Sequence, residues 1–364
     1  MIKEAQKGKG ITLRDIARRA GVNRSTVSRV LNNATDFPVS EKSREKIIAI
    51  AEELQYQPKL SAKSLASGKS FNINLLLASI SRDITSPALA TLIDVISREL
   101  RKNNYNLIIT PVSVSDRATM TREVQAILGS CTVDGSIIGG GLLDKKLRDQ
   151  FSANRIPAVL MDIHCKEEDF GCFPFIHHLA YDENPGQEQL LRHLIELGHK
   201  KIAYITSGPC ADIMQAFGRA VAKYNVDFTD NDIFYFYDWQ HESVSIFERQ
   251  MYYYRKMAEE WKRLRKYSAI VCTDSTGALG VVEFLKDKGL AVGKDVSVTG
   301  YGKYREFGGE LTAIDKAFDE TGKKAVEILL NAIKTPEIQP VHVKIPTQLF
   351  IGNTTGKLQE KKNV

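Results

Sequence analysis

Apolar strand-like runs alternate with amphipathic helical segments from Phe71 almost to the end of this 364-residue chain. The apolar runs are expected to form strands at 73–80, 105–112, 133–141, 156–163, 201–208, 232–239, 269–274, 295–301 and 342–350. Segments whose apolar residues recur at helical spacing are expected between them, at 88–103, 120–128, 147–154, 185–197, 213–224, 243–265, 277–288 and 320–333. Alternating strands and helices form parallel sheets with right-handed crossovers. About ten strands suggest two doubly wound parallel sheets rather than one.

The segment 12–31, TLRDIARRAGVNRSTVSRVL, is typical of two short helices joined by a tight turn. Thr12 can cap the first helix, Asp15 suits its positive start, and Gly21 gives the backbone freedom that a sharp turn requires. The second helix is expected to bury Val27, Val30 and Leu31 and to expose Arg24, Ser25, Ser28, Arg29 and Asn32. Guanidinium and short polar groups on an exposed helix face suit the DNA major groove, and an ordinary helical hairpin is the alternative.

Positive charge is concentrated at the start of the chain. Residues 1–70 hold 14 Lys and Arg against 7 Asp and Glu, whereas the remaining residues hold 36 against 37. A protein binds DNA phosphates through a local basic surface rather than through a high overall charge. The charge distribution therefore favours DNA binding by the N-terminal residues over a merely solvated basic face.

A third helix is expected over 41–54, with Ile47, Ile48, Ala51 and Leu54 on its inner face. The following segment, 59–70, is small, polar and basic, and its large apolar residues are Leu60 and Leu65. Such a segment buries too little surface to form an independent helix. We expect a linker whose lysines are available to phosphates.

The chain lacks the motifs that several functional classes require. The chain has no apolar run of the roughly 20 residues that a membrane span needs, and its N-terminus has no signal-peptide h-region. Its five cysteines lack CxxC spacing, so we expect a reduced, cytoplasmic protein without membrane association. No P-loop or nucleophile elbow is present. The cluster of His164, Cys165, Cys172, His177 and His178 fits no closed zinc motif, so we expect no metal site and no cofactor.

The chain resembles the LacI/GalR family of bacterial transcriptional regulators over nearly its whole length. Three groups of residues carry the resemblance: the segment TLRDIARRAGVNRSTVSRVLN; the segment SEKSREKIIAIAEELQYQPKLSAKSLASGKS; and core segments at 133–135, 197–205, 272–301 and 311–315. The family implies a homodimeric regulator that binds pseudo-palindromic operator DNA. It also implies a core like that of periplasmic sugar-binding proteins, with an effector cleft between two subdomains.

The resemblance assigns roles in DNA binding to individual residues. Arg24, Ser25 and Arg29 would contact base edges. Phosphate contacts would come from Thr12, Thr26, Ser28 and Asn32. Leu65 would enter the minor groove as an apolar wedge, and a linker leucine packed on the core is the alternative.

The effector cleft departs from the family pattern. Ala88 and Leu89 stand where members usually have aromatic residues, Phe217 stands near the position of an arginine, and Gly302 and Lys303 replace an aspartate pair. These changes argue against a conventional pyranoside site, so the ligand differs or none binds. Effector contacts are assigned to Asp83, Asp162, Arg219 and Asp274, with strand-end capping as the alternative role of Asp162 and Asp274. The aromatic residues between Phe234 and Trp261 are expected to pack in the core or an interface, and different stacking surfaces for a ligand are the alternative.

The predicted organisation has three parts: a helix-turn-helix domain (1–57), a hinge helix or linker (58–70) and an effector-binding and dimerisation core (71–364). Within the core, we expect an N-subdomain at about 71–177 and 303–335 and a C-subdomain at about 178–302 and 336–356. The predicted function is that of a nucleoid-associated, dimeric transcriptional repressor, not an enzyme, controlled by a sugar or sugar derivative. One alternative is a regulator with a degenerate cleft that a protein partner controls, and another is a sugar-processing α/β enzyme with a DNA-binding head.

Overall fold

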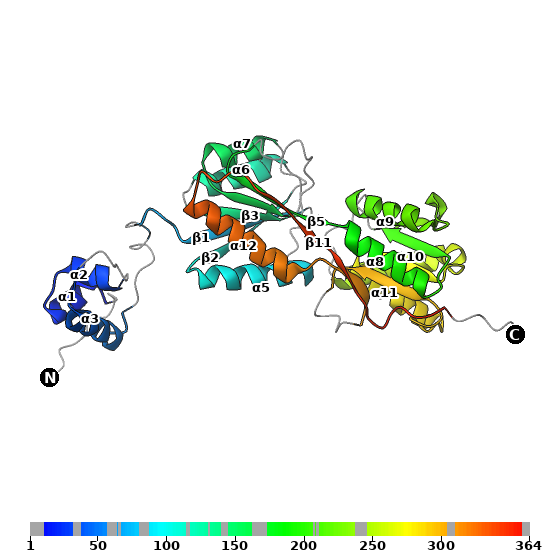
Figure 1. The fold of residues 1–364 in the computed structure, drawn as a ribbon, viewed down its shortest axis with the longest axis horizontal. Coiled ribbons are helices and arrows are strands. Elements are labelled where there is room, and N and C mark those ends of the chain that lie inside the picture. Colours follow the sequence, from blue (N-terminus) through cyan, green and yellow to red (C-terminus); the bar gives the residue numbers. More distant parts are fainter. Residues whose placement is uncertain are drawn as a thin grey trace. The chain divides into compact units, whose positions relative to one another are not determined.

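The computed structural model describes residues 11–31, 38–56, 64, 67–79, 87–113, 117–129, 132–139, 145–161, 173–206, 208, 211–236, 246–303 and 310–358. The chain divides into two compact units, Met1–Lys69 and Ser70–Val364, which we call the N-terminal unit and the core (Figure 1). No helix among the described residues combines the length and the apolar character that a membrane crossing requires.

The N-terminal unit contains the helices α1 (Leu13–Ala20), α2 (Arg24–Leu31) and α3 (Glu41–Glu53). Its small core is formed by Ile16, Ala17, Ala20, Val27, Val30, Ile47, Ile50 and Ala51. Ile48, expected on the inner face of α3, is 37% exposed, and Ile50 is buried in its place. The reason is geometric, because positions 47, 50, 51 and 54 form one helical stripe and position 48 lies outside it.

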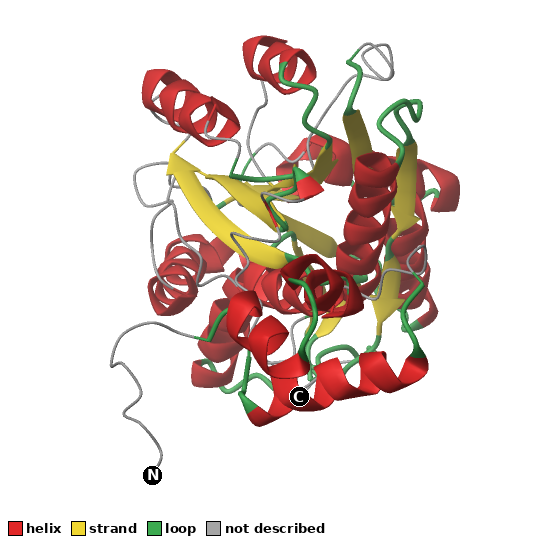
Figure 2. Cartoon of the chain, turned by 90° about the vertical axis from the view of Figure 1, so that its left-hand side faces the viewer, coloured by secondary structure: helices red, strands yellow, loops and turns green. Residues whose placement is uncertain are grey.

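The first sheet of the core has the strand order β11-β5-β4-β3-β1-β2, and all of its pairings are parallel. Its strands are β1 (Asn72–Ser79), β2 (Asn106–Ser113), β3 (Gly135–Gly139), β4 (Ala158–Met161), β5 (Ile176–Asp182) and β11 (His342–Pro346). One face packs against α5 (Pro87–Lys102) and α12 (Phe318–Lys334), and the other against α6 (Arg117–Gly129) and α7 (Lys145–Ala153). Figure 2 shows helices on either side of the strands.

The second sheet has the order β12-β10-β9-β8-β6-β7. Its strands are β6 (Ile202–Thr206), β7 (Ile233–Tyr235), β8 (Ala269–Cys272), β9 (Ser297–Tyr301), β10 (Thr312–Asp315) and β12 (Gln348–Phe350), and a short 3-10 helix, η2 (Asp230–Asp232), precedes β7. One face packs against α10 (Ile246–Leu264) and α11 (Ser275–Asp287), and the other against α8 (Asn184–Glu196) and α9 (Ala211–Tyr224). The edge strand β12 runs antiparallel to β10, unlike the fully parallel sheets expected from the sequence.

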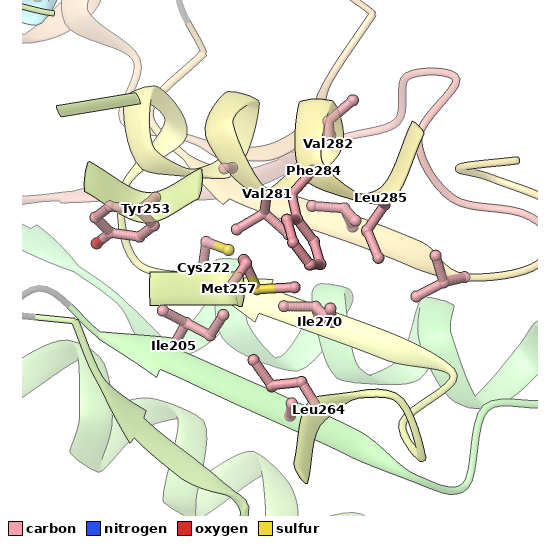
Figure 3. Close-up of a cluster of buried hydrophobic side chains, with 14 of the residues drawn as sticks. Ile205, Tyr253, Met257, Leu264, Ile270, Cys272, Val281, Val282, Phe284 and Leu285 are labelled. Carbon is pink, nitrogen blue, oxygen red and sulfur yellow. The ribbon is translucent and has the colours of Figure 1, made fainter. Parts of the chain in front are cut away.

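Helices α10 and α11 approach each other closely. A Cβ atom at Gly280 would lie 2.1 Å from the backbone oxygen of Gln250, and one at Gly277 would lie 2.4 Å from the ring of Tyr253. Figure 3 shows the apolar cluster that these helices form with the sheet, including Tyr253 and Met257, Val281, Phe284 and Leu285, and the strand residues Ile205, Ile270 and Cys272. As expected, the aromatic residues Phe234, Phe236 and Tyr253 pack in this core.

The chain passes between the two sheets at three places: from β5 to α8, from β10 to α12 and from β11 to β12. The segment 342–350, expected as one strand, is therefore two strands in different sheets, separated by the buried Thr347. Both the backbone N–H and the hydroxyl of Thr347 donate to the Asp182 carbonyl oxygen, each at 3.0 Å. A continuous apolar pattern could not show this change of sheet, because both sheets accept an edge strand there.

The two sheets also divide the sequence differently from the expected subdomain limits. Strand β5 belongs wholly to the first sheet, so the boundary after residue 177 falls inside a strand. Strand β10, expected in the N-subdomain, belongs to the second sheet, and β11, expected in the C-subdomain, belongs to the first. Strands β5 and β10 were not predicted as strands, because each follows a loop and neither begins with a long apolar run.

Candidate functional site

The start of α1 and its turn into α2 have the geometry expected from the sequence. Thr12 is the N-cap, and the Asp15 carboxylate accepts bonds from the Thr12 N–H at 3.0 Å and the Thr12 hydroxyl at 2.7 Å. The hydroxyl bond, followed by the N–H bond, holds the pKa of Asp15 below its usual value. Gly21 has φ 73°, a left-handed conformation that favours glycine, and its N–H donates to the Ala17 carbonyl at 3.0 Å.

Helix α2 has one buried face and one exposed face. Val27 and Val30 are buried at 0% and 2% exposure. Arg24, Ser25 and Arg29 are exposed, and Thr26 and Ser28 are partly exposed. The guanidinium groups at positions 24 and 29 and the hydroxyl at 25 are thus accessible on a helix whose opposite side is fixed by the core of the N-terminal unit. Asn32, also assigned to this surface, lies outside the described residues.

The described part of the linker contains a helical turn. Ser64 and Ser67 are helical, the Gly68 N–H donates to the Ser64 carbonyl at 2.9 Å, and Gly68 has φ 68°. A left-handed glycine is a common helix end. The sequence alone predicted no independent helix here, whereas the resemblance implied a hinge helix. Leu65 lies outside the described residues.

Asp274 stands at the carboxyl end of β8, where an open parallel sheet usually binds its ligands. Its carboxylate accepts bonds from the backbone N–H groups of Thr276, at 3.0 Å, and Gly277, at 3.2 Å, and so caps α11. The same carboxylate forms an ion pair with Arg249 of α10 at 2.7 Å. The capping alternative from the sequence is therefore realised for Asp274, together with an arginine partner that the sequence did not indicate.

Arg219, on the exposed side of α9, donates from Nε to the Asn184 side-chain oxygen at 2.7 Å. Asn184 begins α8, directly after the crossing from the first sheet. Phe217, which the resemblance placed near the position of a family arginine, is 2% exposed and packs against Tyr204 and Phe228. Phe217 is thus a core residue. Arg219, also on α9, places its guanidinium beside the first residue of α8. The other two assigned effector residues, Asp83 and Asp162, lie outside the described residues.

Four further side chains meet near the places where the chain passes between the sheets, and sequence reasoning missed them. The hydroxyl of Tyr301, at the end of β9, donates to the Glu183 carboxylate, which is 7% exposed. The Lys316 ammonium lies 5.3 Å from the Tyr301 ring centroid and 4.1 Å from that of Tyr181. Tyr181 and Glu183 lie at the first crossing, Lys316 lies at the second, and Tyr301 ends β9. Sequence spacing therefore gave no signal that these residues meet.

The structure separates the histidines of the predicted His/Cys cluster. His177 and His178 are consecutive in β5, so their side chains point to opposite faces of the sheet. His177 accepts a bond from the Val341 N–H at 3.2 Å, and the His178 ring lies 6.2 Å from that of His342. Among the described residues, no group of three potential ligands could hold a metal ion. His164, Cys165 and Cys172 lie outside those residues.

The helices that carry the exposed face of α2 match a known family of DNA-binding proteins. The profile described as bacterial regulatory proteins, lacI family, matches residues 12–59, which include α1, α2 and α3. The N-terminal unit is thus similar to the DNA-binding part of LacI-family regulators. A second profile, described as a periplasmic binding protein-like domain, matches residues 191–355 of the core.

The similarity to curated relatives extends along almost the whole chain. The HTH-type transcriptional repressor PurR of Vibrio vulnificus is 28% identical over 356 residues, or 95% of this chain and 99% of the relative. The ribose operon repressor of Haemophilus influenzae is 29% identical over 333 residues, or 89% of this chain and 92% of the relative. These relatives and the two profiles show a LacI-type DNA-binding transcriptional regulator with an effector-binding domain, not an enzyme.

Solved structures show the same fold. The lac repressor dimer bound to operator and the anti-inducer ONPF aligns with a TM-score of 0.74 and 24% identity, covering 95% of this chain and 99% of that one. A complex of the transcriptional regulator CelR with cellobiose aligns with a TM-score of 0.65 and 19% identity, covering 94% and 99%. The helical N-terminal unit and the two-sheet core thus share the fold of these solved regulators.

Proposed function

We propose that this LacI-family regulator is a repressor that binds a pseudo-palindromic operator as a homodimer. The observation that carries the proposal is the exposed Arg24, Ser25 and Arg29 surface on α2, opposite the buried Val27 and Val30. The names of two relatives, PurR and the ribose operon repressor, support the repressor role, and the lac repressor dimer bound to operator supports the assembly. Operator binding would place the protein in the cytoplasm, at the nucleoid.

Each residue assigned to DNA has a chemistry that suits its role. Arg24, Ser25 and Arg29 would contact base edges, because a guanidinium can donate two bonds to guanine. Thr12, Thr26, Ser28 and Asn32 would bind phosphates and fix the register of the helix on the duplex. Leu65 would act as the apolar wedge in the minor groove. Leu65→Ala should then lower specific binding far more than non-specific binding, and equal losses would count against the wedge.

We further propose that a small polar molecule, a sugar or sugar derivative, binds at the carboxyl ends of the strands. Asp83, Asp162, Arg219 and Asp274 are the candidate contacts. The bond between Asp274 and Arg249 supports an altered ligand preference, because a ligand hydroxyl must compete with a bound guanidinium for that carboxylate. The names of the relatives do not choose between a purine-related and a sugar-related effector.

The DNA half of the proposal is tested by selecting duplexes from a random-sequence pool with the full-length protein. We expect enrichment of a sequence with two-fold symmetry and binding of two chains per duplex, measured by light scattering of the complex. Enrichment of asymmetric sites by a single chain would reject the homodimer. The absence of any enriched sequence would reject sequence-specific binding.

The effector half is tested by a thermal-shift screen of sugars, sugar phosphates, sugar acids, nucleobases and nucleosides. A ligand at 100 times its dissociation constant adds about 2.7 kcal/mol of stability, which raises the melting temperature of a domain of this size by several degrees. A selective hit should also change the affinity for the selected duplex. A flat screen with DNA binding intact would reject a small-molecule effector of these classes and favour control by a protein partner.

A further inference from the structure

The core begins with a turn in which a bulky residue, Phe71, adopts a left-handed backbone conformation. Phe71, the residue before β1, has φ 57°, in the left-handed region that bulky side chains rarely occupy. Such a conformation persists where surrounding contacts hold it, and it is found most often at sites with a function. Phe71 directly follows the linker (residues 58–70), so this turn is the first element of the core that the linker meets.

The side chain of Asp134 holds this turn. Its Oδ1 accepts bonds from the Ser70 N–H at 2.7 Å and the Ser70 hydroxyl at 2.9 Å, and its Oδ2 accepts the Phe71 N–H at 2.9 Å. Charge-assisted bonds to backbone N–H groups are stronger than bonds between neutral partners. One partly buried carboxylate thus fixes two consecutive backbone groups at the point where the linker joins the core.

Neighbouring groups complete the turn on its other side. The Asn106 N–H donates to the Phe71 carbonyl oxygen at 2.9 Å, and the Phe71 ring lies 5.8 Å from the Tyr105 ring. Burial, together with the charge of Asp134, raises the pKa of Tyr105, so this phenol stays neutral beside the carboxylate. The turn is therefore held by Asp134 on one side and by the start of β2 on the other.

Asp134 is itself placed rigidly. Its backbone N–H donates to the Asn72 carbonyl at 2.9 Å, and the next residue, Gly135, begins the buried strand β3. A Cβ atom at Gly135 would lie 2.9 Å from the Leu329 side chain of α12 and 3.2 Å from the Pro157 carbonyl oxygen. The backbone beside the carboxylate is thus enclosed by α12 and by Pro157, the residue before β4, and Asp134 is a fixed anchor.

We propose that Asp134 is a positioning residue for DNA recognition: by holding Ser70 and Phe71 in this turn, it fixes where the linker leaves the core. In the sequence, only Lys69 separates Ser70 from Gly68, which ends the helical turn of the linker. A linker fixed at its core end has fewer conformations to lose when it orders on DNA, so the anchor lowers the entropic cost of specific binding. The inference rests on the proposed sequence-specific DNA binding.

The test compares Asp134→Asn with Asp295→Asn in the full-length protein. Asp295 is a matched control, because its carboxylate also accepts a backbone N–H bond, from Ala291 at 2.7 Å, but lies in the loop before β9. For Asp134→Asn we expect the amides of Ser70 and Phe71 to exchange with solvent about tenfold faster. We also expect affinity for the selected duplex to fall about tenfold, with non-specific affinity and dimer mass unchanged. Asp295→Asn should alter none of these quantities.

A milder variant keeps the test decisive if Asp134→Asn folds poorly. Ser70→Ala removes the hydroxyl bond and leaves both backbone bonds, so we expect about a threefold loss of specific affinity. Faster exchange at Ser70 and Phe71 with unchanged specific affinity would overturn the positioning role, and so would equal losses of specific and non-specific binding. If the wild-type protein selects no duplex, the proposed function fails with this inference, whereas failure of the inference alone leaves wild-type selection intact.

Discussion

The exposed face of α2 and the carboxyl end of the second sheet both carry arginines beside short polar residues, but their surroundings differ. On α2, Arg24, Ser25 and Arg29 are exposed to solvent. At the end of the second sheet, Arg249 is bound to Asp274 and Arg219 to Asn184. The first surface is accessible to a large external partner without rearrangement of its helix. The second is cross-linked, so any ligand there must replace bonds that the folded chain already makes.

This contrast follows from how each region is stabilised. The three helices of the N-terminal unit are held by an apolar core on one side, and Arg24, Ser25 and Arg29 on the exposed side of α2 are not part of that core. In the core, the charged residues at strand ends also cap helices and join elements, as Asp274 does for α11. A substitution should therefore affect function without stability in the first region and stability together with function in the second.

The largest expected effect is on the exposed face. Arg29→Ala should bring binding of the selected duplex close to the non-specific level, because each chain of the dimer would lose a bidentate arginine–guanine contact worth about 1–3 kcal/mol of discrimination. Arg29→Lys should lose specificity too, since a lysine keeps the charge but lacks the planar fork. Gel shifts with selected and scrambled duplexes measure both affinities. Arg255→Ala, which removes an exposed charge from α10, is the control and should change neither affinity. Unchanged specific binding in Arg29→Ala would remove α2 as the base-reading element.

The two regions also differ in how well the sequence predicted them. The N-terminal unit was predicted nearly completely, because its turn glycine, its cap and its apolar spacing are local signals within 20 residues. Thr12, Asp15 and Gly21 occupy the expected places. In the core, helices and most strands were predicted from periodicity, but β5, β10 and the division between β11 and β12 were not. Which sheet a short strand joins depends on long-range pairing, for which the pattern carries no signal.

The candidate effector residues show the same limit. The sequence placed Asp274 at a strand end, but its partner Arg249 lies 25 positions earlier and on another helix. The contacts between Glu183 and Tyr301 and between Asp134 and Ser70 likewise join residues far apart in the chain. A motif identifies the type of a residue and its place on an element. The partner that decides whether the residue is available comes from the packing of several elements.

The stability of the two units should depend differently on pH. Residues 1–70 contain no histidine, whereas burial lowers the pKa of His177, His193 and His199 in the core below the usual 6.5. In the unfolded chain these residues take up protons near pH 6.5, but in the folded core they do so only at lower pH. The core should therefore keep its full stability above about pH 6.5 and lose it as the pH falls from there to the lowered pKa values.

The slope can be at most about 1.4 kcal/mol per pH unit for each of these histidines. Amide exchange followed at pH 7.5 and pH 5.5 should show accelerated global opening of the core after correction for intrinsic rates, with little change in the N-terminal unit. In the N-terminal unit the pKa of the Asp15 carboxyl group is lowered, so its contribution to stability is lost only below about pH 4. Equal acceleration in both units would show that the buried histidines do not set the pH response.

A smaller effect is expected at Asp274. Asp274→Ala removes an N-cap, which typically costs 0.5–2 kcal/mol, and separates Arg249 from its carboxylate. The unfolding free energy of the core should fall by about 1–2 kcal/mol in urea, without loss of DNA binding by the N-terminal unit. Asp227→Ala, at an exposed loop position, is the matched control and should stay within about 0.5 kcal/mol of wild type. An Asp274→Ala protein of unchanged stability with a lost ligand response would instead mean that Asp274 serves the effector and not α11.

The smallest effect on stability is expected at Arg219. Its bond to Asn184 is exposed, and exposed pairs of this kind contribute between 0 and about 1 kcal/mol. Arg192→Ala is a matched control, because Arg192 is also exposed on a helix of the same sheet and pairs with Glu196 at 3.9 Å. Both variants should melt within a few degrees of wild type, since neither removes buried contacts. If Arg219 faces the effector, the thermal shift caused by the best ligand of the screen should shrink in Arg219→Ala and persist in Arg192→Ala. Equal ligand shifts in both variants would show that the bond to Asn184 only joins α9 to α8. In that case the carboxyl end of the second sheet differs from α2 in function as well as in its bonding.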